Sequence, residues 1–477
     1  MKIIPLLQQV NSINLENIIP KKSALYLLAA FCILFAAVFI LISPGMYISV
    51  FPNDINSNYY AFYGRNLLRL SPGEHRLRNI DAVVQTKPQP MYIGQPMTYY
   101  HDHPFLLSFL TGVFELVPEN IFPGGRLVSI LSSLGIIILC FFIAHKLNGN
   151  YLSALFSSFT VSIIYIFMAH GVIVNFEPLT LFFMLLSYYF FIKGLNKALI
   201  AAVFIGCFTD WPFYFFSFFL FLQIIFTCKK NYKIILVMAA APLLAITVTD
   251  CCTGGFVWQM FHGLFLSSKS SSVKFDYRFF CGQKNFMIVN YGRYLLIAAA
   301  LSSLLLFCNL RKFKDIIAAG GVFLFTALGN ILFFREWAHS HPFWNYYFTG
   351  FFSIVLSFIP VLKNKIMVYI ILILIGGQAY IQIKLFRDLR YYRSLSEAEA
   401  FRIRPILKEI KSMAQKNDGC IYTDHYIYDS NRFIKNYLDL PARITDKKNE
   451  QSPYIIYQLS RPDGSFVPLG DNLWYRK

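Results

Sequence analysis

The sequence predicts a polytopic α-helical membrane protein with about eleven transmembrane helices, followed by a small soluble α/β domain at the carboxyl terminus. Of its 477 residues, 56% are hydrophobic and only 14% are charged. Such a composition excludes an ordinary soluble domain. Long apolar stretches recur along the chain, and every second connection between them is basic. Composition, recurrence and alternating charge together predict this fold class.

Each predicted span is an apolar stretch that can cross roughly 30 Å of hydrocarbon as a helix, which takes about 17 to 25 residues. The fifth and sixth stretches are shorter and almost adjoin at the sequence TDWP. The eleven predicted spans are residues 24–47, 126–144, 151–170, 175–192, 198–209, 212–227, 233–249, 293–309, 316–334, 343–361 and 366–383.

The loops between the spans predict the orientation of the chain, because Lys and Arg in short loops mark the cytoplasmic side. Alternate loops are basic, for example around Lys146 and Arg311. We therefore expect a multi-pass protein of the cell inner (plasma) membrane, with a cytoplasmic amino terminus and an extracytoplasmic carboxyl-terminal domain. The outer loops hold the acids Asp54, Asp102, Glu177, Asp210, Asp250 and Glu336.

Three regions are predicted along the chain. Residues 1–22 form a cytoplasmic amphipathic segment, and residues 23–385 form the transmembrane core with long outer loops at 48–125 and 250–292. Residues 386–477 form the α/β domain outside the membrane.

The predicted elements of that last domain follow from the spacing of its apolar residues. Residues 396–415 have the spacing of an amphipathic helix, and residues 431–438 that of a second helix. Short strands are predicted at 419–424 and 452–459, where β-branched and aromatic residues are bounded by turn signals.

The net charge of +18 does not indicate nucleic-acid binding. The basic residues are scattered over inner loops and the tail, as membrane topology requires, and no basic stripe is interleaved with stacking aromatics. The partners expected from this charge are the phosphates of anionic membrane lipids.

Two carboxylates at the membrane edge, Asp54 and Glu177, are the first candidates for chemistry, since an acid there is costly unless solvated or paired. The helical pattern YYAFYGRNLL begins five residues after Asp54, and Glu177 precedes Pro178 at the start of a span. An ordinary helix cap explains the first acid, and a favourable helix dipole explains the second, about as well as catalysis does.

Other outer-loop residues gather imidazoles and cations on the same predicted face. The sequence HDH at His101, Asp102 and His103 suits a metal, a phosphate or a solvated turn. Elsewhere the cations and imidazoles could hold a phosphate. These later candidates are His262, Lys269, Lys274, Arg278, Arg335 and His341.

Five motifs occur in order between residues 24 and 384. Asp54 is followed by Tyr60, Ala61, Gly64, Arg65 and Asn66, and a His-Pro pair follows at His103 and Pro104. The sequence GRLVS occupies 125–129, Glu177 comes next, and HPFWNYY occupies 341–347. In order and sidedness, these motifs resemble the GT-C superfamily of membrane glycosyltransferases. The similar branch contains protein O-mannosyltransferases and the aminoarabinose and galacturonate transferases of lipid A.

The resemblance implies transfer of a sugar from a polyprenyl-phosphate donor to an acceptor hydroxyl at the outer face, with inversion. The acceptor classes are lipid A, another envelope glycan or a protein. Asp54 would be the general base and Glu177 a second acid that orients a substrate, since an oxocarbenium-like transition state needs a carboxylate to take the acceptor proton. Cations would stabilise the departing phosphate. The implied phosphate and substrate ligands are Arg65, His103, Lys269, Lys274, Arg278, Arg335 and His341.

Two positions depart from the pattern. Several relatives place a lysine where this chain has His103, and an arginine is expected where it has Ser267. The donor-phosphate contacts therefore stay open, with Lys269, Lys274, Arg278 and Arg335 as candidates. No cofactor is required, but the resemblance implies a divalent metal near Asp102 and His262, the positions that correspond to a metal site in the aminoarabinose transferases.

Two other classes of protein share some of these features. A lipid or oligosaccharide transporter or flippase would also have many spans, but it should carry charged groups and broken helices near mid-membrane. A scaffold would act through its tail. The spans here are nearly free of charge, and the ionisable residues lie at their ends, which favours an enzyme.

Overall fold

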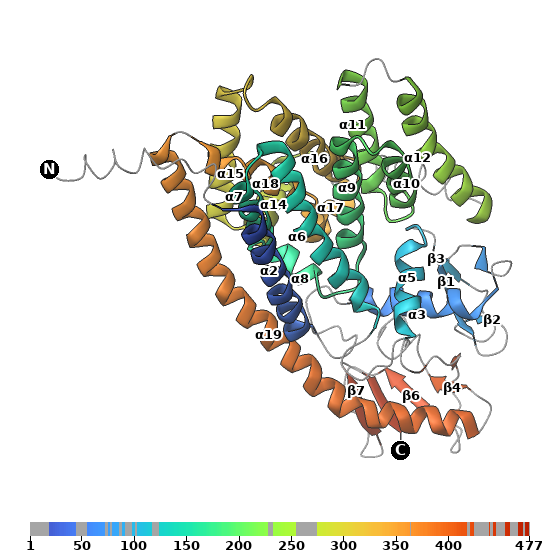
Figure 1. The fold of residues 1–477 in the computed structure, drawn as a ribbon. Helices are drawn as coiled ribbons and strands as arrows, with labels where there is room; N and C mark the ends of the chain where they lie inside the picture. Colours follow the sequence, from blue (N-terminus) through green and yellow to red (C-terminus); the bar gives the residue numbers. More distant parts are fainter. Residues whose placement is uncertain are drawn as a thin grey trace. The chain divides into compact units, whose positions relative to one another are not determined.

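The protein forms two compact units in the computed structural model (Figure 1). Unit 1 comprises residues 1–41, 129–171 and 176–388, and unit 2 comprises residues 42–128, 172–175 and 389–477. The structure describes residues 19–43, 55–71, 75–76, 79–84, 88–90, 98–100, 103–116, 124–227, 232–253, 274–362, 364–416, 420–423, 438, 442–444, 454–457, 466–470 and 473–476.

Unit 1 is built from helices that follow the apolar stretches of the sequence. Its core is largely aromatic and aliphatic, with Phe141, Tyr188, Phe213 and Tyr291 among the buried side chains. The helices that lie mainly in it are α2 (Lys21–Ile42), α6 (Arg126–Asn148), α7 (Tyr151–Ser162), α8 (Tyr165–His170), α9 (Phe176–Lys193), α10 (Asn196–Gly206), α11 (Pro212–Thr227), α12 (Tyr232–Thr253), α14 (Tyr277–Tyr291), α15 (Arg293–Cys308), α16 (Lys314–Phe333), α17 (Arg335–Ser340), η2 (Pro342–Asn345), α18 (Phe348–Leu356) and η3 (Ile359–Val361).

The chain has several helices that fit a membrane, as predicted, so it is a polytopic membrane protein. Among the described residues, six helical segments are long and apolar enough to span it: α2, α6, α9, Ile234–Cys251 of α12, α16 and Lys365–Tyr391 of α19. The pair α14 and α15, bent by 101°, adds a seventh if it counts as one span. Each predicted stretch contains a helix, whereas the number of eleven crossings stays a prediction.

Two predicted spans are broken rather than continuous. The stretch 151–170 divides into α7 and α8 because Ile164 has extended backbone, with φ −91° and ψ 121°. The stretch 343–361 consists of η2, the nine-residue α18 and η3, with Pro342 and Pro360 near the starts of the two 3-10 turns. Apolar composition alone does not reveal either break.

Helix α14 lies within residues 250–292, which the sequence analysis treated as an outer loop. Asp276 caps its start by accepting a hydrogen bond from the Phe279 amide at 3.0 Å. Gly292 ends it with φ +76° and ψ 150°, a conformation open almost only to glycine. A Cβ at Gly292 would also overlap the Gln378 side chain. The glycine therefore sets the sharp bend into α15.

The amino-terminal part of unit 2 consists of two helices and a small sheet. Helix α3 (Ile55–Arg69) packs on α5 (Leu106–Glu115), and β1 (Asn79–Val84) pairs with β2 (Pro88–Pro90) and β3 (Thr98–Tyr100) in the order β2-β1-β3. The helices touch backbone to backbone at Gly64 and Gly112, where a Cβ on either residue would overlap the other helix. Small residues permit such close crossings.

The carboxyl-terminal part of unit 2 contains the end of α19 (Lys365–Lys416) and a five-stranded sheet of order β5-β4-β6-β8-β7. Strand β4 is parallel to β5 and β6, and the remaining pairs are antiparallel. The strands are β4 (Ile421–Thr423), β5 (Ala442–Ile444), β6 (Tyr454–Tyr457), β7 (Phe466–Gly470) and β8 (Leu473–Arg476).

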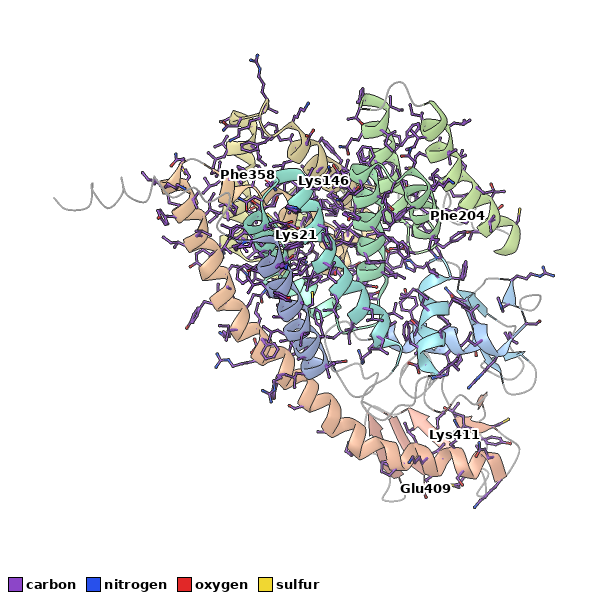
Figure 2. All side chains as sticks on the ribbon, viewed as in Figure 1. Lys21, Lys146, Phe204, Phe358, Glu409 and Lys411 are labelled. Carbon is purple, nitrogen blue, oxygen red and sulfur yellow. The ribbon has the colours of Figure 1, made fainter. Side chains whose placement is uncertain are left out.

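The predicted amphipathic helix at 396–415 and the strands at 419–424 and 452–459 correspond to α19, β4 and β6. On this part of α19, Leu407 and Ile410 are buried while Glu409 is exposed (Figure 2). Helix α19 runs through the predicted domain boundary at 385/386 without a break, and the division into predicted domains stays a prediction. The second predicted helix, at 431–438, lies almost entirely outside the described residues.

Candidate active site

The site in unit 1 is centred on Glu177, in the first turn of α9. Pro178 follows it, and proline suits this turn because its missing N–H would have no partner in the helix. The Glu177 side chain is 1% exposed, and its Oε2 lies 3.3 Å from Nδ1 of His170, which is also 1% exposed. A carboxylate so deeply buried requires such a partner. His170, the last residue of α8, is not among the site residues predicted from the sequence.

An aromatic layer connects this pair with His341, another predicted site residue. The His170 ring centroid lies 5.8 Å from that of Phe343. The His341 ring stacks on Phe343 at 5.0 Å and on Trp337 at 5.7 Å. His341 is half-buried, and burial lowers its pKa from the usual 6.5. The structure thus brings Glu177 and His341 into one cluster and favours a neutral His341.

A second buried acid, Asp210, belongs to the same region. It is fully buried at the turn between α10 and α11, and Tyr347 Oη donates a long hydrogen bond to its Oδ2 at 3.5 Å. Both Asp210 and Glu177 are close enough to Tyr347 to act on it electrostatically. From the sequence, Asp210 is predicted only as an outer-loop acid. Its position in TDWP, between two short apolar stretches, was the available signal.

Three predicted phosphate ligands lie around α14 and α17. Lys274 precedes α14 and is exposed, Arg278 lies in its first turn and is exposed, and the Arg335 guanidinium lies 5.1 Å from the Phe275 ring. The two helices are held together by Gln283 Nε2, which donates to the Ala338 carbonyl at 2.7 Å. These three cations therefore belong to one pair of packed helices.

In unit 2, Arg65 and His103 are placed on and beside helices α3 and α5. The Arg65 guanidinium lies 6.0 Å from the Phe62 ring. His103 precedes α5, and its carbonyl accepts a hydrogen bond from Asn79 Nδ2 at 3.4 Å. The side chains of both residues are partly exposed, which leaves them accessible to a ligand.

Two hydrogen bonds hold residues 172–175, the segment that leads into α9. The fully buried Arg126, from the GRLVS motif, donates through Nη1 to the Val172 carbonyl at 2.8 Å. The Val174 amide donates to Ser57 Oγ on α3 at 2.8 Å. In the sequence, Ser57 comes three positions after Asp54, and Val174 three positions before Glu177. The second bond joins residues 172–175 to the start of α3 within unit 2.

Comparison with known proteins identifies the fold. Residues 99–209 match the family model of dolichyl-phosphate-mannose-protein mannosyltransferases. The crystal structure of apo ArnT from Cupriavidus metallidurans aligns with a TM-score of 0.55 and 12% identity, covering 94% of this chain and 98% of that one. ArnT bound to undecaprenyl phosphate aligns with a TM-score of 0.54 and 11% identity, covering 96% and 98%. The chain has a GT-C fold. A sequence search of curated proteins finds no match.

The segment matched to the mannosyltransferase family contains several of the residues described above. It includes His103, Arg126, His170 and Glu177, and it ends one residue before Asp210. The resemblance predicted from the motifs is therefore confirmed at the level of the GT-C fold, whereas the role of each residue stays a prediction.

Four predicted site residues lie outside the described residues: Asp54, Asp102, His262 and Lys269. They include the predicted base and both predicted metal ligands. Within the described part of the chain, no group of three or more His, Cys, Asp or Glu side chains is placed to hold a metal ion. The divalent metal consequently stays a prediction.

Proposed function

We propose that this protein is a membrane glycosyltransferase that moves a sugar from a polyprenyl-phosphate donor to an acceptor hydroxyl at the outer face, with inversion. The observation that carries the proposal is the buried Glu177–His170 pair, in a segment that matches a family acting on a dolichyl-phosphate sugar. The likeness to ArnT along nearly the whole chain supports it, and one of those ArnT structures holds undecaprenyl phosphate.

In the proposed reaction, the acceptor oxygen attacks the anomeric carbon as the bond from that carbon to the phosphate oxygen breaks. The phosphate leaves with the bonding electron pair, and Asp54 takes the proton of the acceptor hydroxyl. Positioned general bases typically contribute about 10² to 10⁴ in rate. Glu177, held by His170, orients a substrate.

Cations would stabilise the phosphate as its charge develops. Lys274, Arg278 and Arg335 are supported as ligands because they share the packed pair α14 and α17. Arg65, His103, Lys269 and His341 complete the proposed set. The reaction needs no organic cofactor, because the phosphate is already a good leaving group, and a divalent metal at Asp102 and His262 would add positive charge beside it.

The proposal includes the location of the protein. The basic loops support a plasma-membrane protein of about eleven spans, with its amino terminus in the cytoplasm and its carboxyl-terminal α/β domain outside. The acceptor would be lipid A, another envelope glycan or a protein, all of which present hydroxyls at that face.

The test compares cells that express the wild-type chain, the Asp54→Asn variant and, as a matched control, Asp388→Asn, which makes the same change at an exposed carboxylate of α19. Envelope glycolipids and glycoproteins are analysed by mass spectrometry. We expect a sugar-bearing product with the wild type and the control, and about 10²-fold less or none with Asp54→Asn, at equal protein levels in the membrane. Near-normal product from Asp54→Asn would refute the assignment.

A further inference from the structure

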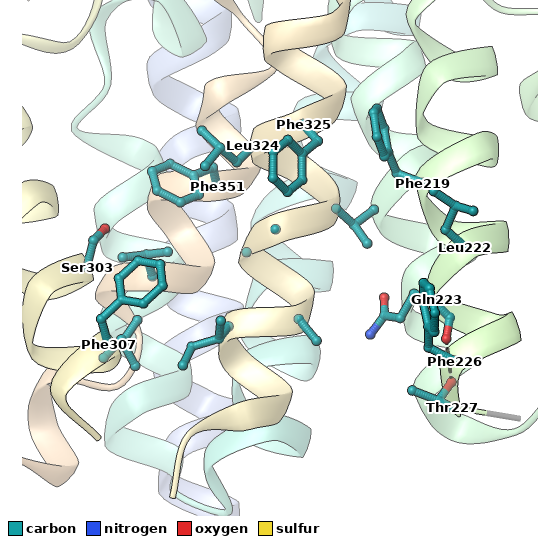
Figure 3. A pocket seen from close by; sticks show the side chains of 17 residues that line it. Phe219, Leu222, Gln223, Phe226, Thr227, Ser303, Phe307, Leu324, Phe325 and Phe351 are labelled. Atoms are coloured by element: carbon teal, nitrogen blue, oxygen red, sulfur yellow. Dashed lines mark hydrogen bonds between the residues drawn. The ribbon is translucent and has the colours of Figure 1, made fainter. Parts of the chain in front are cut away.

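Unit 1 contains an apolar groove that the proposed reaction does not use. It has a volume of about 710 Å³, which is within the usual range of small-molecule sites. Helix α16 forms its floor, α11 and α15 form its sides, and Phe351 of α18 closes part of it (Figure 3). Only Gln223, Thr227 and Ser303 among its 17 lining residues carry polar side chains.

Large aromatic side chains at the rim of the groove are exposed. Phe226 of α11 is 71% exposed, Phe307 of α15 is 61% exposed and Phe325 of α16 is 52% exposed. Two of the polar side chains donate hydrogen bonds within the protein: Gln223 Nε2 donates to Tyr188 Oη, and Thr227 Oγ1 donates to the Gln223 carbonyl. A hydrocarbon chain fits such a surface better than water or a polar ligand does.

The depth of the groove corresponds to a single leaflet. Along α16 its lining runs from Ile317 to Phe325, three to eleven residues beyond Lys314. At 1.5 Å per residue this is about 5 to 17 Å from the helix start, which corresponds to half of a roughly 30 Å hydrocarbon core. On α11 and α15 as well, the lining residues lie towards the ends that adjoin the basic loops.

The charged residues beside the groove indicate which class of lipid it would bind. The connection between α15 and α16 carries Arg311, Lys312 and Lys314, all exposed, against the single carboxylate Asp315. Lys312 Nζ lies 4.9 Å from the Phe313 ring. Each basic residue near a membrane surface attracts anionic lipid by about 1 kcal/mol.

We propose that this groove binds an anionic phospholipid of the leaflet beside the basic loops, with an acyl chain in the groove and its phosphate against Arg311, Lys312 and Lys314. The site is distinct from the proposed active site. Tyr188, which contacts the groove residue Gln223 by a hydrogen bond, lies eleven residues along α9 from Glu177, or about 17 Å. The inference does not depend on the proposed reaction.

The test uses the purified full-length protein in detergent and native mass spectrometry with phosphatidylglycerol or phosphatidylcholine at equal concentration. We expect phosphatidylglycerol to be retained about tenfold more than phosphatidylcholine. Arg311→Gln/Lys312→Gln should abolish this preference, whereas Lys193→Gln/Lys197→Gln, at another basic connection, should keep it. Equal retention of both lipids by the wild type would overturn the proposal.

The groove itself is tested by filling it. A Cβ at Gly321 has no neighbour nearer than 3.9 Å, so Gly321→Trp adds bulk to the groove without a backbone clash. It should remove bound phosphatidylglycerol, while Ile373→Trp, at an exposed apolar site on α19, should not. If Gly321→Trp does not fold, benzoylphenylalanine at Phe325 should cross-link to phosphatidylglycerol. Three results would each overturn the proposal. Gly321→Trp could still retain phosphatidylglycerol, benzoylphenylalanine at Phe325 could fail to cross-link to it, or Gly321→Trp could displace polyprenyl phosphate instead of phosphatidylglycerol.

Discussion

A buried carboxylate and its imidazole partner determine the character of the candidate site at the scale of single residues. Glu177 and His170 are seven positions apart, on different helices, and each is 1% exposed. Removing one partner of a buried pair destabilises the folded state by about 3 to 5 kcal/mol in other proteins. The sequence indicated that Glu177 starts a helix, but it could not indicate its partner. The contact depends on the break between α8 and α9, which no periodicity encodes.

His341 provides a prediction on pH. Because burial lowers its pKa from 6.5 in the folded protein, the unfolded chain binds more protons as the pH falls through 6.5. Stability should therefore be highest above pH 6.5 and decline on acidification, until the pH is below the folded-state pKa. His341→Phe keeps a ring between Trp337 and Phe343 but cannot titrate.

The measurement is the thermal unfolding midpoint of the detergent-purified protein at pH 7.5 and pH 5.5. We expect the decrease between these two values to be smaller for His341→Phe than for the wild type. His339→Phe, at an exposed histidine of the same region, serves as the control and should behave like the wild type. An unchanged decrease in His341→Phe would contradict the lowered pKa.

At the scale of elements, most helices could be predicted and their interruptions could not. Apolar runs such as that of α16 predict a span directly, because nothing else buries so much hydrocarbon. Helix α14 was not predicted because Lys284 and Asn285 interrupt its apolar residues, so that its apolar content is lower than that of a membrane span. Gly292 was the visible signal for its end, but a glycine alone does not reveal a 101° bend.

The bend supplies a prediction for Gly292→Ala. The alanine would have to adopt φ +76°, which costs about 1 to 3 kcal/mol, and its Cβ would meet Gln378. We expect a lower unfolding midpoint by thermal denaturation. Gly321→Ala provides the opposite control, since it lies inside α16 with free space around it and should gain up to about 1 kcal/mol of helix stability. Equal midpoints for the two variants would contradict this account of the bend.

At the scale of the whole molecule, the sequence predicted the GT-C fold but not the division into units. Order and sidedness of motifs such as HPFWNYY were sufficient for the fold, which the comparison with ArnT confirms. The two units interleave along the chain: residues 172–175 belong to unit 2 although both flanking segments belong to unit 1. Arg126 and Ser57 hold that short piece by hydrogen bonds to its backbone, and such contacts leave no pattern in the sequence.

The orientation in the membrane is the remaining prediction at this scale. Alkaline phosphatase is active only outside the cytoplasm, where its disulfides can form. Fused after Lys477, it should be active, and fused after Gly149, between α6 and α7, it should be inactive at equal expression. If the Gly149 fusion were active and the Lys477 fusion inactive, every loop would lie on the side of the membrane opposite to the predicted one, with Glu177 on the cytoplasmic side.

The backbone contact between α3 and α5 has a consequence for how this protein can change by mutation. At most packed positions, a larger residue is tolerated once its neighbour becomes smaller. Gly64 and Gly112 do not allow such a compensating substitution, because they contact each other and neither can be replaced by a smaller residue. A library that randomises both codons should return glycine at both positions, with no compensating pairs.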